Sequence, residues 1–305
     1  MGSRMKFRVA VWMIAFALPV SPPAARAAHV GLLPMETVFQ GRGRFEDLIA
    51  QIKSRAGQIR ALSIGQRVCW FGQVLAGTPY KGFTLEIHDR IEAPSVNFNG
   101  LDCWTFFEVS LALARMVEEP AEQWTPESLL RYIEMDRYWG GRCDGTYLSR
   151  LHYLEDWLHD NTQRGLVHDL TRSLGGIAVA NSAIEMTHNW KKYRYMRSNP
   201  EFRTGIMELE SRLRSQPLVM IPKSRVRGIE DRLQNGDIIG IVGHDGDAYG
   251  TSHVGMAYRD KDGVLHFMHA SAPSNYGKVV IDARLSDYLE KFRTHAGIMV
   301  ARPVR

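Results

Sequence analysis

The residue best placed for covalent chemistry is Cys103, which follows Asp102 and opens the apolar helical pattern of residues 103–117. Asp102 is a plausible helix N-cap, because its carboxylate can accept a hydrogen bond from a first-turn amide. A thiol in that turn lies near unpaired N–H groups and the positive end of the helix dipole, and both favour the nucleophilic thiolate. The sequence therefore predicts Cys103 as a nucleophile at an accessible helix start.

The other two cysteines fit other roles. Cys69 lies within a helical apolar pattern and is expected to be buried, whereas Cys143 lies in a glycine-rich loop with no base beside it in sequence. An odd cysteine count in an exported chain leaves at least one thiol unpaired, so a Cys69–Cys143 disulfide is one hypothesis. No CxxC or CxxH spacing points to a structural zinc site, and no metal or organic cofactor is expected.

A cysteine nucleophile needs a general base, and the base needs a group that orients it. His253 and His269 lie in two neighbouring β-type runs, at residues 253–258 and 264–270, which predict a hairpin. These two histidines are the candidates for the base and its partner. A zinc site formed by them with Cys103 is a less favoured alternative, since such sites usually show tighter ligand spacing.

The length of the hairpin loop decides whether the two histidines can meet. If residues 261–263 form a three-residue loop with Gly263 left-handed, the numbers of paired residues sum to 524. His253 and His269 then lie on one face as diagonal neighbours, about 7–8 Å apart at Cα, and Gly255 faces His269. A two-residue loop would place them on opposite faces.

The elements that must position these residues follow a simple order. Apolar spacing predicts helices at residues 45–60, 64–75 and 103–117, and residues 120–235 read mostly as helices and loops. Short β-type runs follow, spaced as in an antiparallel meander, at residues 237–242, 253–258, 264–270, 278–281 and 297–301. Helices first and sheet last predict an α+β fold. We expect one catalytic domain, residues 28–305, with a helical insertion at about 120–235.

Residues 1–27 resemble a secretory signal peptide. A basic start (Arg4, Lys6 and Arg8) precedes an apolar run too short to span a bilayer, and residues 25–27 give a small-x-small cleavage pattern. Cleavage would remove four of the five net positive charges, so no nucleic-acid partner is expected. The prediction is a periplasmic or secreted protein without stable membrane insertion; a retained anchor is the alternative.

Six motifs in order resemble the N-acetylmuramoyl-L-alanine amidase-like branch of the NlpC superfamily of papain-like cell-wall cysteine hydrolases. They lie within residues 63–302, at 77–86, 101–106, 149–157, 235–239, 252–255 and 269–271. The resemblance implies a papain-like NlpC-type fold, with the nucleophile helix packed on an antiparallel sheet and helical insertions over the groove. It also implies hydrolysis of the amide between the lactyl group of N-acetylmuramic acid and L-alanine, in peptidoglycan fragments (muropeptides).

The same resemblance implies roles for individual residues. Cys103 is the nucleophile, His253 the base and His269 the residue that orients it, while Tyr80 lies near the nucleophile. Further candidates for substrate binding are Asp102, Trp104, Arg150, His152 and Tyr153.

Two of these candidates leave a second interpretation open. Arg150 and Tyr153, as helical residues, would share a face, and Arg150 could clamp a peptide carboxylate or lock the insertion to the core. Asp102 could bind substrate or only cap its helix. Two residues depart from the family pattern: Phe83 stands where a small residue is expected, and Trp104 where Thr or Ser is commoner.

Three other functions remain open. A γ-D-glutamyl-diamino-acid endopeptidase would use the same three residues on a different bond of the same peptide. A lipid thioesterase or acyltransferase would bind an acyl chain instead. A muropeptide-binding module would carry an unreactive Cys103.

Overall fold

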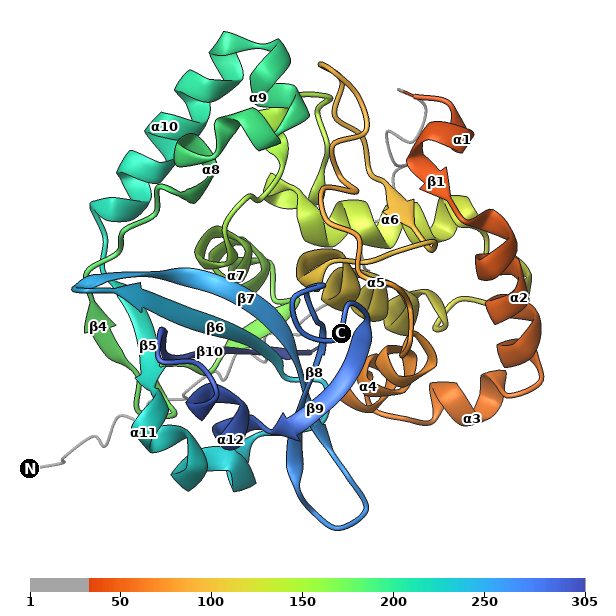
Figure 1. The fold of residues 1–305 in the computed structure, drawn as a ribbon. Helices are drawn as coiled ribbons and strands as arrows, with labels where there is room; N and C mark the ends of the chain where they lie inside the picture. Colours follow the sequence, from red (N-terminus) through yellow and green to blue (C-terminus); the bar gives the residue numbers. More distant parts are fainter. Residues whose placement is uncertain (1–32, 305) are drawn as a thin grey trace, which may run out of the picture.

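An eight-stranded antiparallel sheet crosses residues 33–304, the part of the chain that the computed structural model describes (Figure 1). The strands run in the order β4–β5–β10–β6–β7–β8–β9, and β3 also pairs with β10. Their bounds are β3 (Val167–Asp169), β4 (Ile177–Val179), β5 (Leu218–Pro222), β6 (Ile238–Asp245), β7 (Ala248–Arg259), β8 (Leu265–Ala270), β9 (Val279–Arg284) and β10 (His295–Pro303). The predicted signal segment, residues 1–27, lies outside the described residues.

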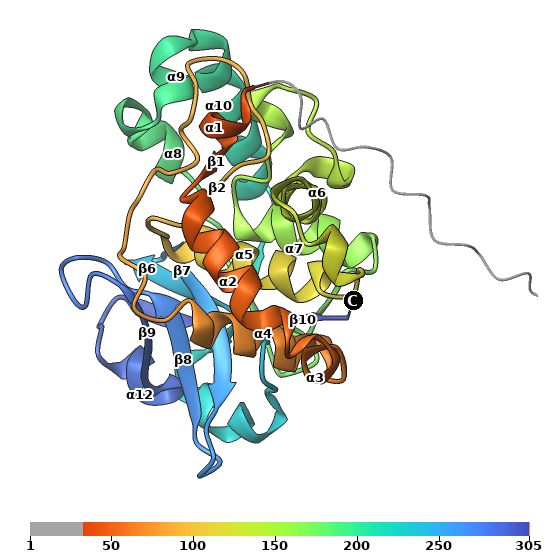
Figure 2. The same cartoon turned by 90° about the vertical axis from the view of Figure 1, so that its right-hand side faces the viewer.

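Most helices precede this meander, which makes the fold α+β as the sequence predicts. They are α1 (Met35–Val38), α2 (Arg42–Lys53), α3 (Ala56–Arg60), α4 (Ile64–Val74), α5 (Cys103–Met116), α6 (Pro126–Arg137), α7 (Leu154–Gln163), α8 (Glu185–His188), α9 (Arg194–Ser198), α10 (Pro200–Arg214), α11 (Lys223–Val226) and α12 (Leu285–Glu290). Helices α8–α10 gather at the end of the molecule away from the β7–β8 turn (Figures 1 and 2). A separate parallel pair joins β1 (Phe39–Gln40) to β2 (Val96–Asn97).

Three expectations about these elements need correction. The helix predicted at 45–60 is two helices, because the chain leaves helical geometry at Arg55 (φ −105°, ψ 6°). Helix α12 follows β9 without having been predicted. The stretch at 120–235 contributes strands β3, β4 and β5 as well as helices. These strands have three to five residues, too few for the alternation of a half-buried strand to stand out.

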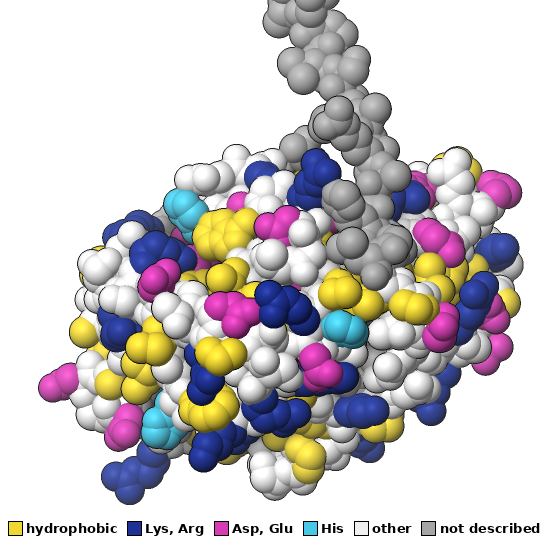
Figure 3. Space-filling view, turned by 90° about the horizontal axis from the view of Figure 1, so that it is seen from above, with side chains coloured by type: hydrophobic (Ala, Val, Ile, Leu, Met, Phe, Trp, Pro, Cys, Tyr) yellow, Lys and Arg dark blue, Asp and Glu magenta, His cyan; other side chains and the backbone are white. Residues whose placement is uncertain are grey.

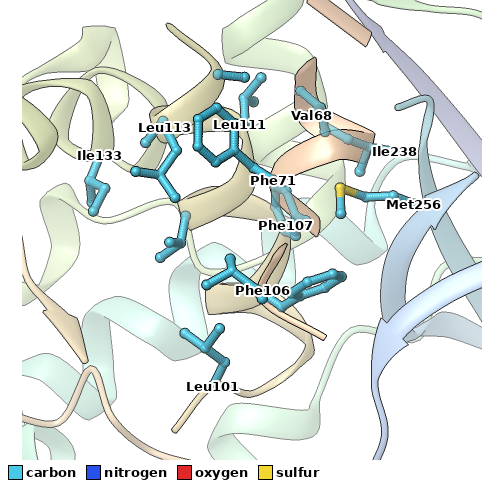
Figure 4. Close-up of a cluster of buried hydrophobic side chains, with 14 of the residues drawn as sticks. Val68, Phe71, Leu101, Phe106, Phe107, Leu111, Leu113, Ile133, Ile238 and Met256 are labelled. Carbon is cyan, nitrogen blue, oxygen red and sulfur yellow. The ribbon is translucent and has the colours of Figure 1, made fainter. Parts of the chain in front are cut away.

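Helix α5 is the centre of the core between the sheet and the outer helices. Its side chains from Thr105 to Met116 are buried, and it packs on α4, β7 and β8. Figure 4 shows Phe106 and Phe107 of α5 among apolar side chains that include Met256 of β7. Each buried phenylalanine stabilises the fold by about 1.5–3 kcal/mol, so the position of Cys103 at the start of α5 is held firmly.

The hairpin β7–β8 has the predicted register. Met256 pairs with Met268 and Tyr258 with His266, so the numbers of paired residues sum to 524 in both cases. The loop closes with an Asp260 N–H to Val264 O hydrogen bond of 3.0 Å, and Gly263 is left-handed (φ 80°). This register keeps the two histidines on one face of the sheet, as the three-residue loop requires.

Candidate active site

Cys103 begins α5 directly after the capping residue Asp102. The Oδ1 atom of Asp102 accepts the Thr105 N–H at 2.8 Å, and the Asp102 N–H donates to Thr105 Oγ1 at 3.0 Å. This reciprocal capping box confirms that Asp102 is the N-cap. Asp102 also lines the cavity beside Cys103, so capping does not remove it from the site.

The thiol of Cys103 is neutral in the free protein. Burial raises the pKa of Cys103 to about 12, and the charge of Asp102 acts in the same direction. Hydrogen bonds from the backbone amides of Val254, Trp104 and Cys103 itself lower this pKa, but they do not outweigh burial. The amides at the helix start thus act in the predicted direction, but burial outweighs them, so ionisation needs a base.

A chain of hydrogen bonds leads away from the cavity through two histidines to a carboxylate. His253 Nε2 lies 2.7 Å from His269 Nδ1, and His269 Nε2 lies 3.4 Å from Asp282 Oδ2. His269 and the Asp282 side chain are only 2% and 5% exposed. Lys291 Nζ contacts the other oxygen of Asp282. The structure thus joins the two predicted histidines and adds Asp282, which the sequence analysis missed.

A β-bulge explains both the position of Asp282 and why it was missed. Between β8 and β9 the register shifts, from His266 opposite Arg284 to Met268 opposite Ile281. The bulge adds a residue to β9 and turns Asp282 towards His269. The sequence signal was only a short β-type run ending at residue 281, and such runs do not reveal bulges.

Asp282 fixes the tautomers of both histidines. Burial favours the neutral acid, but hydrogen bonds from His269 and Lys291 outweigh it and hold the pKa of Asp282 well below its usual range. An ionised carboxylate only accepts hydrogen bonds, so His269 carries its proton on Nε2 and accepts at Nδ1. His253 then donates from Nε2, which leaves the lone pair on its Nδ1.

Burial, with smaller contributions from the charges of His269 and His295, lowers the pKa of His253 to about 3, so its imidazole is neutral. His253 and Cys103 line the same cavity. Neutral thiol and neutral imidazole thus face a common space, and proton transfer between them can accompany attack on a substrate.

The cavity has two branches that share His253. The first, here called the aromatic branch, has a volume of about 290 Å³, contains Cys103 and is lined by Tyr80, Phe83, Trp104 and Tyr193. The second, the polar branch, has a volume of about 620 Å³ and does not include Cys103. It is lined by three acidic residues, Glu155, Glu185 and Asp245, and no Lys or Arg is among its described lining residues.

All six predicted substrate-binding residues line the aromatic branch. Tyr80 lines the cavity beside Cys103, and burial, with smaller contributions from Cys103 and Asp102, raises the pKa of its phenol. Trp104 packs edge-on against Phe107. His152 lies 2.8 Å from the Tyr147 carbonyl through Nε2. Tyr153 lines both branches and donates to Glu210 Oε1 at 2.6 Å.

Arg150 is locked into the protein. Its guanidinium contacts Glu86 at 2.9 Å and Glu92 at 3.5 Å, and it lies 4.7 Å from the centre of the Tyr147 ring. Two carboxylates therefore already compensate its charge, which supports the structural interpretation over a carboxylate clamp. The predicted shared helix face is wrong, because Arg150 precedes α7 and Tyr153 is its extended N-cap.

The other cysteines take no part in the site. Cys69 is buried, as predicted, and Cys143 is buried as well although it lies in a glycine-rich loop. All three thiols are unpaired, and the proposed Cys69–Cys143 disulfide is not formed. Cys69 donates instead to the Ala257 carbonyl at 3.0 Å. Among residues 33–304, no cluster of three or more His, Cys, Asp or Glu side chains is arranged to hold a metal ion.

On the face of the molecule seen in Figure 3, basic and acidic side chains are interspersed. No helix within residues 33–304 is long and apolar enough to cross a membrane.

Similar solved structures cover nearly the whole described chain. An N-acetylmuramoyl-L-alanine amidase from Bacteroides uniformis is 26% identical, with a TM-score of 0.70, over 79% of this chain and 99% of its own. A Bacteroides fragilis protein named as a candidate xylanase is 32% identical, with a TM-score of 0.66, over 76% and 99% of the two chains. A Legionella pneumophila protein, at 22% identity and a TM-score of 0.62, shares the fold over 87% and 97%.

A search of curated proteins found no significant match. The family model described as AmiA-like, N-acetylmuramoyl-L-alanine amidase-like, matches residues 70–298. This range includes Cys103, His253, His269 and Asp282. The chain belongs to the N-acetylmuramoyl-L-alanine amidase-like family.

Proposed function

We propose that this protein is a cysteine amidase that cuts the bond between N-acetylmuramic acid and L-alanine in peptidoglycan fragments. Family membership supports an amidase acting on peptidoglycan. The observation that carries the cysteine mechanism is one cavity lined by both Cys103 and His253, with His253 at the end of the chain through His269 to Asp282. A papain-like mechanism of the NlpC type fits this arrangement.

The reaction proceeds through an acyl-enzyme. As Cys103 Sγ attacks the lactyl carbonyl carbon, its proton passes to His253 Nδ1 and the C–S bond forms. His269 and Asp282 stabilise the resulting imidazolium through the two hydrogen bonds behind it. The proton then moves to the alanine nitrogen as the C–N bond breaks, and water, deprotonated by His253, hydrolyses the thioester. The Cys103 backbone N–H and Tyr80 are our candidates to stabilise the oxyanion.

A cell-wall substrate places the reaction outside the cytoplasm. Export by the predicted signal at residues 1–27 to the periplasm or the medium is consistent with this substrate. N-terminal sequencing of the protein secreted by its own host tests the cleavage site. A mature chain that still begins at Met1 would contradict export by cleavage.

The decisive experiment is mass spectrometry of a disaccharide-tetrapeptide digest. Wild-type protein should release the intact tetrapeptide, the Cys103→Ala variant should release nothing, and the buried-cysteine control Cys69→Ser should still cut. Release of a sugar that keeps L-alanine and D-glutamate would favour the endopeptidase instead. Hydrolysis by Cys103→Ala would contradict the cysteine mechanism. Lack of cleavage by the folded wild type would leave the lipid hydrolase and the binding module, which acyl-thioester hydrolysis and calorimetry separate.

A further inference from the structure

The mouth of the aromatic branch is formed by an unusual phenylalanine. Phe83 has a left-handed backbone (φ 59°), the only such residue other than glycine in the described chain. Its side chain is 49% exposed, yet it lines the cavity of Cys103. Its ring meets Tyr193 edge-to-face, with 5.5 Å between the ring centres.

Neither the left-handed backbone of Phe83 nor its half-exposed ring adds to the stability of the fold. A left-handed conformation is strained for a side chain with a Cβ, and glycine would adopt it without cost. A half-exposed ring also gains little from burial. Strained backbone conformations of this kind are concentrated at functional sites. The strain at Phe83 therefore points to a role for its ring in binding a ligand in the cavity.

The two branches must hold different halves of the substrate. The acyl group stays bonded to Cys103 in the acyl-enzyme, so it belongs in the branch that contains Cys103. The amine leaves with a proton from His253, which faces both branches. The released peptide therefore belongs in the polar branch, which has no Lys or Arg among its described lining residues to repel a new ammonium group.

The aromatic branch has several aromatic walls, and its carboxylates Glu86, Asp102 and Glu185 are all engaged within the protein, by Arg150, Thr105 and Asn189. Tyr80, Phe83, Trp104, Tyr153 and Tyr193 all line it. Its one guanidinium, Arg150, is already paired with Glu86 and Glu92 and offers no uncompensated charge to a carboxylate. The C–H face of a pyranose ring can pack against aromatic rings without needing a counter-charge.

We propose that Phe83 and Tyr193, whose rings touch edge-to-face, form one aromatic wall, here called the clamp, against which the sugar ring of N-acetylmuramic acid packs. This inference rests on the proposed function, because it takes the sugar as the acyl half of the substrate. It makes Phe83 a specificity-determining residue that acts on binding. The proton-transfer chain does not depend on it.

Two matched substrates test the clamp. One is the muramoyl-tetrapeptide, and the other is the lactoyl-tetrapeptide, which keeps the scissile amide but lacks the sugar. Phe83→Ala should raise KM for the first by roughly three- to tenfold, with kcat almost unchanged, and leave the second unaffected. Phe83→Trp should keep the preference for the sugar. Equal effects of Phe83→Ala on both substrates would overturn the clamp.

Stability and a second exposed aromatic provide the controls. Phe83→Gly should raise KM in the same way without lowering Tm, because glycine relieves the left-handed backbone. A lower Tm with no change in KM would show a purely structural role and contradict the proposal. Tyr276→Ala removes a ring that is 52% exposed and lines neither branch, so it should change neither KM.

Binding separates failure of the clamp from failure of the proposed function. Calorimetry with Cys103→Ala protein should show tighter binding of the muramoyl than of the lactoyl peptide, and adding Phe83→Ala should abolish the difference. If the difference is absent from the start, the clamp is wrong whichever bond is cut. If it is present but the wild type cuts another bond, the clamp stands and the proposed scissile bond falls.

Discussion

The β7–β8 hairpin has an Asp–His pair at its turn and a second pair, completed by Asp282 of β9, at its open end, and the two pairs lie in different surroundings. At the turn, Asp260 Oδ2 lies 2.9 Å from His266 Nε2, and the two side chains are about a quarter exposed. At the open end, Asp282 Oδ2 lies 3.4 Å from His269 Nε2, and both side chains are almost fully buried. The two histidines lie three residues apart on β8, and residue types alone do not distinguish the two pairs.

The difference lies in the second nitrogen of each histidine. His266 Nδ1 contacts the Asp282 backbone carbonyl at 2.8 Å, so the protein itself uses both ring nitrogens. His269 Nδ1 contacts His253, which opens onto the cavity. An Asp–His pair can therefore support proton transfer here only where its second nitrogen leads to a space that admits substrate.

The largest effect should come from removing the base. His253→Ala should lower kcat by about 10³-fold, because Cys103 then has no group to take its proton, whereas His266→Ala should stay within about twofold. Steady-state hydrolysis of the disaccharide-tetrapeptide measures both. Equal losses of kcat in the two variants would contradict a functional difference between the open end and the turn of the hairpin.

Asp282→Asn should have the next largest effect. The asparagine amide can donate to His269 Nε2 and so favour the tautomer that no longer accepts from His253; we expect kcat to fall by about 10²-fold with KM unchanged. Asp260→Asn is the matched control and should have little effect. A change in KM alone would place Asp282 in binding rather than in orientation of the base. Nitrogen-15 NMR of the histidines reads the tautomers directly.

The pH dependence of Cys103 alkylation tests whether the nucleophile near the open end of the hairpin is a neutral thiol before substrate binds. Since the pKa of Cys103 is raised to about 12, the thiolate fraction falls as pH decreases, and the iodoacetamide rate should rise about tenfold per unit between pH 7 and 10. The Cys103→Ala variant gives the background from Cys69 and Cys143. A rate that levels off near pH 7 would show a thiolate that already exists without substrate.

The smallest effect is expected at the turn. Gly263 is left-handed, and a Cβ there would meet no atom within 4 Å, so Gly263→Ala should cost about 1 kcal/mol through backbone strain alone. Thermal unfolding should show the loss while kcat stays unchanged. A fall in kcat without a fall in Tm would mean that the two ends are coupled.

Local rules made much of this site predictable. The N-cap role of Asp102 depends only on residues 102–105, and the register of the hairpin depends only on the length of its loop. Both follow from contacts close in sequence, and both were confirmed. They place Cys103 at a helix start, and His253 and His269 on one face, without knowledge of the remaining fold.

The missed features depend on contacts that are distant in sequence. Asp282 reaches His269 through a bulge, and Arg150 meets Glu86 from 64 residues away. The pKa of Cys103 is set by burial, which a helix start alone does not determine. Phe83 was noticed as a departure from a family pattern, but its left-handed backbone became visible only in the structure.

Strand β10 lies between β5 and β6, so the sheet cannot be completed until β10 has joined it. Strands β3 and β5, from the 120–235 stretch, pair with β10, and β6 pairs with its other edge. The last strand of the described chain is therefore the one that joins the two halves of the sheet. Such long-range pairings close slowly, and until they do the chain exposes unpaired strand edges. A chain cut short before residue 295 would carry every residue of the Cys103–Asp282 machinery and still be unable to join its two halves.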